Sequence, residues 1–322
     1  MDLSASRQHG YQLHVERLPD GRHRIAIAPG HGSPDAAMSW TTAYPTELIL
    51  EIHAQKRAFV CDEIRREEDP HYVERAIRHE MLGYVEPEAF RGKRILDFGC
   101  GAGASAIVMS RVLPPCEIVG VELEERLVKL AALRAACLGR RALRFLVSPS
   151  GTAPPAGLGD FDYIVLSAVY EHLLPTERGA LLPRLWRHLR PGGVIFINQT
   201  PHRYSPIEIH TTGLPLINYL PDAVACWVAR RFSPRLKGDE EWPALLRAGV
   251  RGATVGEILR ALGDDAELVQ PRRGDHIDLW YGKLSSRHRW LKAAIWAALK
   301  ALKPLADVHL VPQLTLAIRK PA

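Results

Sequence analysis

The sequence predicts an α/β protein in which a largely parallel sheet carries helices on both faces. Short apolar runs alternate with helical stretches between residues 94 and 198, and a glycine-rich turn follows the first run directly. Parallel strands need a crossover connection, usually a helix, so this alternation is typical of a parallel sheet. The chain of 322 residues is 47 % hydrophobic and 24 % charged, which is enough to bury a sizeable core.

The N-terminal part predicts a hairpin and then helices. Residues 11–18 and 22–28 alternate loosely between polar and apolar, and the turn tripeptide Pro19-Asp20-Gly21 lies between them. Residues 29–45 are rich in Gly, Pro and Ser and are expected to form a loop. From residue 46 to about 85 the pattern is helical, with a break at Asp69-Pro70.

The remaining elements follow in order. Apolar runs predict strands, and the stretches between them have helical spacing. The expected strands are 94–98, 117–121, 143–147, 163–167, 194–198, 267–269 and 314–318. The first expected helix follows the glycine turn and ends at about 112. The others are 124–138, 176–189 and 254–262. A turn is expected at 190–193, where the sequence is Arg-Pro-Gly-Gly.

Charge and cysteine content exclude several classes of protein. The 42 Lys and Arg residues exceed the 36 Asp and Glu residues by six, and no block of like charge resembles a nucleic-acid-binding tail. The five cysteines are widely spaced without a CxxC pair, so neither a disulfide framework nor a zinc site is expected. The first ten residues lack the apolar core of a signal peptide, and the sequence has no apolar run long enough to span a membrane. We therefore expect a soluble cytoplasmic protein.

The turn after the first strand carries the clearest functional signal. Gly99, Gly101 and Gly103 follow the strand 94–98 and precede a helix, which places backbone N–H groups around a ligand. Such a turn alone also fits any tight strand-to-helix connection. Asp97 at the strand end would repel a pyrophosphate but suits a cationic amine, and Glu122 after the second strand suits a ribose diol. A diol joined to a cationic amino acid describes S-adenosylmethionine better than NAD.

With these residues the chain resembles the class I S-adenosylmethionine-dependent methyltransferases, in the broad type-11-like group of bacterial small-molecule enzymes. The glycine pattern of 97–103, Glu122, Glu171-His172 and the segment 189–193 occur in the expected order. The resemblance implies a Rossmann-like seven-stranded sheet with six parallel strands and one antiparallel strand, and S-adenosyl-L-methionine as cofactor. Ser150 stands where the family usually has an acid for the adenine amine. The implied cofactor-binding residues are Asp97, Gly99, Cys100, Gly101, Gly103, Glu122, Leu123, Ser150 and Ser167.

The resemblance also suggests how the chain is organised. We expect an N-terminal extension at 1–45, a cofactor-binding core at 46–200, a core helix and strand at 253–271, and a last strand at 314–322. Two insertions, 201–252 and 272–313, do not fit the alternation. Both follow strands whose carboxyl ends face the cofactor, so we expect them to form a cap over the substrate.

Candidate catalytic and substrate-binding residues follow the fourth and fifth strands. Methyl transfer to oxygen needs alignment and a base, and histidine is suited to neutral pH. The alternatives are that Glu171-His172 only orders its turn and that the loop after the fifth strand is merely solvated. The expected catalytic residues are His172, His202 and His210, and the expected substrate-binding residues are Asn198, Gln199, Tyr204, Glu208 and Glu171.

Metal binding and membrane contact are weaker hypotheses. His202, Glu208 and His210 have suitable donor atoms, but their spacing fits no helix or strand face, so no metal is expected. Residues 287–303 form a basic amphipathic helix in which four cations share one face: Arg289, Lys292, Lys300 and Lys303. This helix either contacts an anionic membrane or packs its apolar side on the protein.

The sequence thus favours a methyltransferase for a small or medium-sized acceptor. Methylation of a hydroxyl on a sugar, a lipid-linked intermediate or a natural product is the first hypothesis, because the expected site offers neutral bases. An amine or guanidine acceptor is the alternative, and a nucleic acid or protein acceptor ranks lower. An anionic acceptor would suit the surplus of positive charge. The sequence names neither the acceptor nor the oligomeric state.

Overall fold

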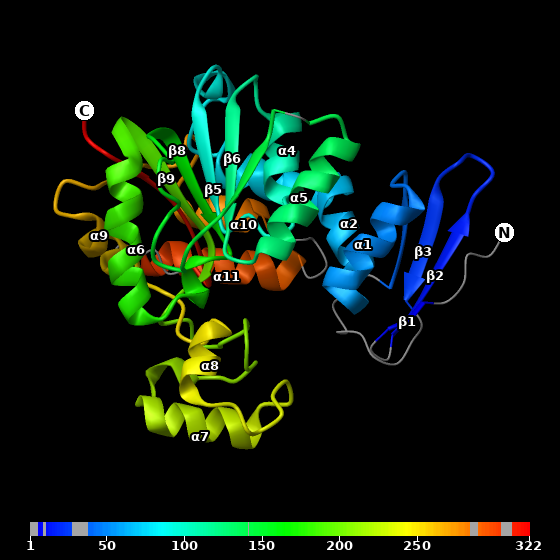
Figure 1. Cartoon of the computed structure of the whole chain (residues 1–322). Coiled ribbons are helices and arrows are strands. Elements are labelled where there is room, and N and C mark those ends of the chain that lie inside the picture. Colours follow the sequence, from blue (N-terminus) through cyan, green and yellow to red (C-terminus); the bar gives the residue numbers. More distant parts are fainter. Residues whose placement is uncertain (1–5, 9–10, 28–37, 141, 284–288, 304–310) are drawn as a thin grey trace.

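A seven-stranded sheet forms the centre of the molecule (Figure 1). The computed structural model describes residues 6–8, 11–27, 38–140, 142–283, 289–303 and 311–322. The strand order is β10-β11-β9-β8-β5-β6-β7, and only β11 runs antiparallel to its neighbours, as predicted. The strands are β5 (Arg94–Phe98), β6 (Glu117–Glu122), β7 (Arg144–Val147), β8 (Phe161–Ser167), β9 (Leu189–Pro201), β10 (Glu267–Leu268) and β11 (Gln313–Arg319).

Helices cover both faces of this sheet, because each buried strand is apolar on both sides. On one face Leu181 and Leu185 of α6 and Ile258 of α9 pack against Ile164 and Ile195 of the strands. On the other face α3 and α4 cover a second apolar cluster. The helices of the core are α3 (Arg75–Glu80), α4 (Ala104–Val112), α5 (Glu125–Cys137), α6 (Pro175–His188) and α9 (Val255–Leu262), and a short turn, η4 (Tyr170–His172), follows β8.

Strand β9 is longer than the sequence predicted. The segment 189–193 was expected to be a turn, yet it continues the ladder beside β8 with a register shift between Phe161 and Tyr163. Its other edge is held by the C-terminal segment, where Gly192 N–H donates to the carbonyl of Lys320 at 2.9 Å. The pairing partner lies at the far end of the chain, so local sequence gave no sign of it.

The N-terminal residues form a separate antiparallel sheet beside the core (Figure 1). Residues 39–42, expected to be loop, form its edge strand β4, whereas 28–37 lie outside the described residues. Its strands are β1 (Ser6–Gln8), β2 (Tyr11–Arg17), β3 (His23–Ile27) and β4 (Ser39–Thr42). The segment that joins it to the core contains α1 (Thr46–Lys56), η1 (Arg57–Phe59), α2 (Val60–Glu68), the π-helical turn η2 (Pro70–Glu74) and, after α3, η3 (Pro87–Phe90).

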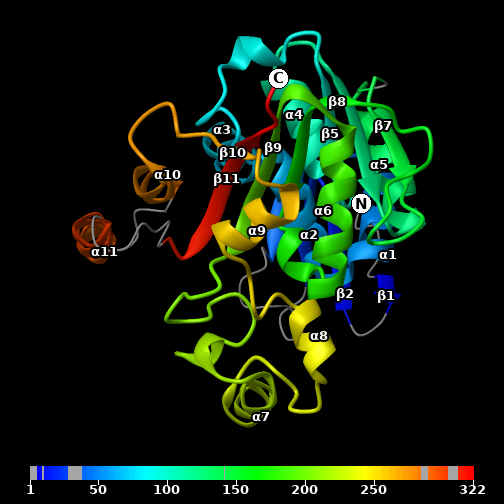
Figure 2. The same ribbon diagram turned by 90° about the vertical axis from the view of Figure 1, so that its left-hand side faces the viewer.

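The two insertions lie on different flanks of the molecule. Figure 2 shows α7 (Asp222–Phe232) and α8 (Trp242–Arg247) below the sheet, after the short turn η5 (Ile217–Tyr219). The helices α10 (His276–Lys283) and α11 (Arg289–Leu302) lie to one side in the same view, and α10 packs against α3 and β11. The expectation of one shared cap is therefore not met, because α10 buries its apolar residues beside the sheet edge.

Helix α11 exposes much of its apolar surface. Trp296 and Leu299 pack against the core, whereas Trp290, Leu291 and Ile295 are exposed. Residues 287 and 288 of the predicted helix lie outside the described residues. In the part of the chain that the structure describes, no helix combines the length and apolar character needed to cross a membrane.

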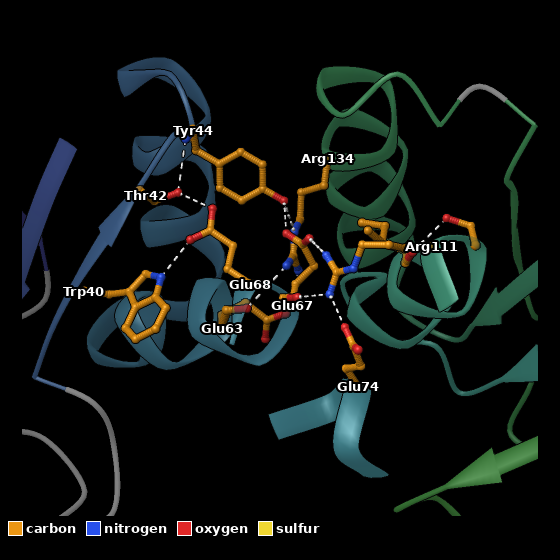
Figure 3. A network of polar contacts seen from close by, with 11 residues as sticks. Trp40, Thr42, Tyr44, Glu63, Glu67, Glu68, Glu74, Arg111 and Arg134 are labelled. Carbon is orange, nitrogen blue, oxygen red and sulfur yellow. Dashed lines mark hydrogen bonds and ion pairs between the residues drawn. The ribbon is translucent and has the colours of Figure 1, made fainter. Parts of the chain in front are cut away.

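A buried guanidinium joins the N-terminal helices to the core (Figure 3). Arg134 of α5 is fully buried and donates to Glu63 Oε1 of α2 at 2.7 Å and to the carbonyl oxygen of Ala102 at 2.9 Å. Burial raises the pKa of the Glu63 carboxyl, but the positive charges around it, above all Arg134, outweigh this effect. The pKa of Glu63 therefore lies below its usual value. Arg111 and Tyr44 extend the network by binding Glu67.

Replacing Arg134 with Ala should destabilise the protein by about 3–5 kcal/mol, because Glu63 would keep a buried charge without its partner. The free energy of unfolding can be measured by urea denaturation. Arg126→Ala is the control, since Arg126 is exposed on the same helix and pairs with Glu124, a contact worth no more than about 1 kcal/mol. Equal losses in the two variants would contradict this role of Arg134.

Candidate active site

The turn between β5 and α4 is shaped by three glycines with positive φ. Gly99, Gly101 and Gly103 have φ of +79°, +55° and +85°, which side chains rarely allow. A Cβ atom on Gly99 would lie 2.5 Å from Cγ2 of Val169, so the loop after β8 packs directly on this turn. The turn therefore tolerates no larger residue at Gly99, and Gly99, Cys100, Gly101 and Ala102 line a cavity.

Asp97 lies buried at the end of β5, beside this turn. Its Oδ2 accepts a hydrogen bond of 2.5 Å from Ser105 Oγ, at the start of α4. Burial raises the pKa of the Asp97 carboxyl to about 6, and the nearby Glu122 contributes in the same direction. A buried carboxylate of this kind is stabilised by a cationic ligand.

Glu122 ends β6 and holds the neighbouring loops through its carboxylate. Oε2 accepts the N–H of Gly101 at 2.9 Å, and Oε1 accepts the N–H of Leu123 at 2.6 Å. The side chain is half-buried, whereas Leu123 is exposed. The acid thus connects the glycine turn to the end of the neighbouring strand.

The other residues expected at the cofactor have different surroundings. Cys100 is buried, and its Sγ would lie 2.8 Å from a Cβ atom on Gly120, so its side chain faces the sheet. Ser150 Oγ accepts the N–H of Thr152 within its own turn. Ser167 lines the cavity beside the glycine turn.

Two adjoining cavities lie between the sheet edge and the N-terminal helices. The first, of about 170 Å³, is bounded by the glycine turn, the end of β8 and the helices α2, α3 and α4. The second, of about 250 Å³, shares four lining residues with the first, namely Arg66, Val73, Ala76 and Gln199. The second is also lined by His71, Tyr72, Arg75 and Gln313. The residues of α2, η2 and α3 that line these cavities could not be recognised from the sequence, because they look like part of an ordinary amphipathic helical segment.

Gln199 lies between the two cavities in a left-handed backbone conformation, with φ of +63°. Its Nε2 donates to Glu80 Oε2 of α3 at 3.1 Å, and its carbonyl accepts from Gln313 Nε2 at 2.9 Å. The adjacent Asn198 is fully buried, and its side-chain amide has no hydrogen-bond partner among the described residues. Of these residues, the sequence pointed only to Asn198 and Gln199.

The three candidate histidines do not form one group. His172 and His210 lie together, with ring centroids 5.4 Å apart, and Glu171 lies beside them. His202 is buried elsewhere in the loop, where its Nδ1 accepts the N–H of Tyr204. His172 follows the carboxyl end of β8, whereas His202, Tyr204 and His210 all lie in the loop after β9.

Glu208 and Tyr204 serve their own loop. Glu208 is buried, and its carboxylate accepts the N–H groups of His210, Thr211 and Thr212. Tyr204 is half-exposed and accepts a hydrogen bond from Tyr219 through its carbonyl oxygen. The ligand atoms of His202, Glu208 and His210 are therefore not gathered at one point in the described part of the chain.

The arrangement fits the cofactor that the sequence suggested. S-Adenosylmethionine has a cationic amine and a ribose diol, and the buried Asp97 and the half-buried Glu122 have the chemistry to hold them. The glycine turn allows the backbone to approach a ligand closely. Lys56 and Arg66 add positive charge to the same cavity, and Glu63 and Glu80 add negative charge. The side chains of the site thus match a cofactor with both cationic and anionic groups.

Affinity for S-adenosylmethionine should fall about tenfold between pH 7 and pH 5, because Asp97, with its pKa of about 6, becomes protonated over that range. Asp97→Asn should bind weakly, without this pH dependence. Titration calorimetry of the wild type, Asp97→Asn and the exposed control Asp160→Asn tests this. The prediction fails if Asp97→Asn keeps the pH dependence of the wild type.

Comparisons with known proteins point to the same cofactor. A family model described as a methyltransferase domain matches residues 95–193. The trans-aconitate 2-methyltransferase of Azoarcus sp. is 28 % identical over 53 % of this chain and 72 % of its own length. That of Methylobacterium radiotolerans is 27 % identical over 71 % and 75 %. The ubiquinone biosynthesis O-methyltransferase of Thiobacillus denitrificans is 31 % identical over 36 % of this chain and 49 % of its own length.

The matched region contains the glycine turn, Glu122 and the strands that position them. The sheet has the strand directions expected of this fold, with six parallel strands and one antiparallel strand. The chain is a class I S-adenosylmethionine-dependent methyltransferase.

Proposed function

We propose that the enzyme transfers a methyl group to an oxygen atom of a small acceptor that carries an anionic group. The observation that carries this proposal is the second cavity, which adjoins the cofactor site and is lined by Arg66, His71 and Arg75. No carboxylate is among the residues that line it. A cavity of this charge favours an anion over an amine or guanidine.

The names of the relatives support an oxygen acceptor. Trans-aconitate is itself an anion, and the ubiquinone relative is named as an O-methyltransferase. The acceptor of this chain need not be either compound. A hydroxyl on a sugar, a lipid-linked intermediate or a natural product remains within the proposal if the molecule also carries an acidic group.

The chemistry assigned to the protein is mostly alignment and shielding. When bound, S-adenosylmethionine supplies a methyl group on a sulfonium, which is a good leaving group. Gln199, between the two cavities, is placed to orient the acceptor, and the surrounding helices exclude water. We propose that His172 and His210, in the loops after β8 and β9, promote loss of the proton from the hydroxyl.

Arg75→Gln should raise the KM for an acidic acceptor about tenfold or more, because a charged hydrogen bond to the acceptor is lost. The KM for S-adenosylmethionine should not change. Transfer of tritiated methyl to a panel of hydroxylated acids, trans-aconitate and the matching amides measures both constants. We expect the acids to be methylated in preference to the amides.

Arg78→Gln is the matched control, since Arg78 lies on the same helix but pairs with Glu74 and does not line the second cavity. The proposal is wrong if amines are methylated faster than acids. It also fails if the two arginine variants change the acceptor KM equally.

We also propose that α11 contacts an anionic membrane surface. Its exposed apolar residues include Trp290, Leu291 and Ile295. Lys300 binds Asp275 and Asp278 of the neighbouring segment, so fewer cations than the sequence suggested face outward. The apolar face therefore contributes most of the proposed contact.

Vesicles containing anionic lipid should sediment with the wild type at low salt, and Ile295→Glu should weaken this binding because it places a charge on the apolar face. Leu133→Glu, at an exposed position on α5, is the control. The contact is excluded if neither the wild type nor the Leu133→Glu control sediments with anionic vesicles.

A further inference from the structure

Three potential metal ligands meet at the edge of the sheet where β8 and β9 end. Glu171 and His172 belong to the turn η4 after β8, and His210 comes from the loop after β9. One ligand atom of each lies within 4.8 Å of the other two. Glu171 Oε1 and His172 Nε2 are 3.8 Å apart.

The imidazole of His172 is held in the orientation that a ligand needs. Its Nδ1 is 2.7 Å from the carbonyl oxygen of Arg247. A carbonyl only accepts hydrogen bonds, so Nδ1 carries a hydrogen, and in the neutral imidazole Nε2 then has a free lone pair. Histidine ligands of metals commonly make this second contact, which fixes the ring.

The carboxylate of Glu171 is prepared in a similar way. The residue is fully buried, and Oε2 accepts a hydrogen bond from Thr200 Oγ1 at 3.1 Å. Its Oε1 faces the two histidines and has no hydrogen-bond partner in the described part of the chain. A buried carboxylate oxygen without a hydrogen bond is costly, and a cation at this place would remove that cost.

His210 is brought to the cluster by features of its own loop. Glu208 Oε1 accepts the backbone N–H of His210 at 2.7 Å. Gly249 has φ of +99° and leaves room for the ring, because a Cβ atom there would lie 2.5 Å from Cδ2 of His210 and 3.4 Å from Cγ of Glu171. His210 is exposed, so the cluster is open to solvent on one side.

We propose that Glu171, His172 and His210 bind a divalent transition-metal ion such as Zn²⁺ or Mn²⁺. Two imidazoles and one carboxylate are a common ligand set for such ions, and three protein ligands leave positions open for other donors. The ion connects the turn after β8 to the first insertion. An oxygen of the acceptor at an open position would lose its proton more readily; this role, unlike metal binding itself, rests on the proposed function.

The test is titration calorimetry of the chelator-treated full chain with Zn²⁺, together with the visible absorption of the Co²⁺ form. We expect one ion per chain. Thr200→Val, which removes the bond to Glu171, should weaken Zn²⁺ binding about 10–100-fold, and His210→Ala or Glu171→Gln should weaken it further.

His188→Ala is the matched control, because His188 also has Nδ1 near a backbone carbonyl, that of Gly159, but lies outside the cluster. It should bind Zn²⁺ like the wild type. Circular dichroism checks that each variant is folded. The proposal is overturned if the wild type binds no stoichiometric ion, or if a folded His210→Ala binds Zn²⁺ as tightly as His188→Ala.

The two proposals fail in different ways. Methylation of an acidic acceptor by a protein that binds no ion would overturn the metal site and leave the proposed function standing. Conversely, the chain could bind one ion through His210 and yet methylate only amines. That result would support the metal site and overturn the proposed function.

Discussion

The burial of the Arg134 guanidinium is the constraint on which the cofactor site depends. A charge without solvent must be paired, and Arg134 finds its partners in Glu63 of α2 and in the carbonyl of Ala102 in the glycine turn. The carbonyl of Ala102 belongs to the core itself, but Glu63 becomes available only when the N-terminal helices have docked on the core. Pairing of the buried charge and closure of the cavity by Lys56 and Arg66 are therefore parts of one folding event.

Most of the sheet was predictable because its strands are short apolar runs separated by clear turn residues. The strand 94–98 was predicted to the residue, since Gly99 ends it abruptly. The full extent of β9 was not, because its first residues pair with the C-terminal segment. Strand β4 was missed because its Gly- and Ser-rich surroundings look like loop.

The site divides in the same way between local and distant determinants. Asp97 and Glu122 could be identified because each lies at the carboxyl end of a strand. The walls formed by Arg66 and Glu80 could not, since nothing in a helical pattern shows which of its polar faces borders a cavity. Three polar residues of the loop after β9 have different contacts that their sequence does not reveal. His210 contacts His172, His202 orders its own turn, and Glu208 binds backbone amides.

The placement of the second cavity has a consequence for how this fold diversifies. The region that matches the methyltransferase family model, 95–193, contains the glycine turn and Glu122 but none of the helices that enclose the acceptor side. The walls of the second cavity come instead from segments before and after the matched region. These segments can therefore vary in sequence while the sheet and its turn stay the same, as long as Glu63 is kept as the partner of Arg134.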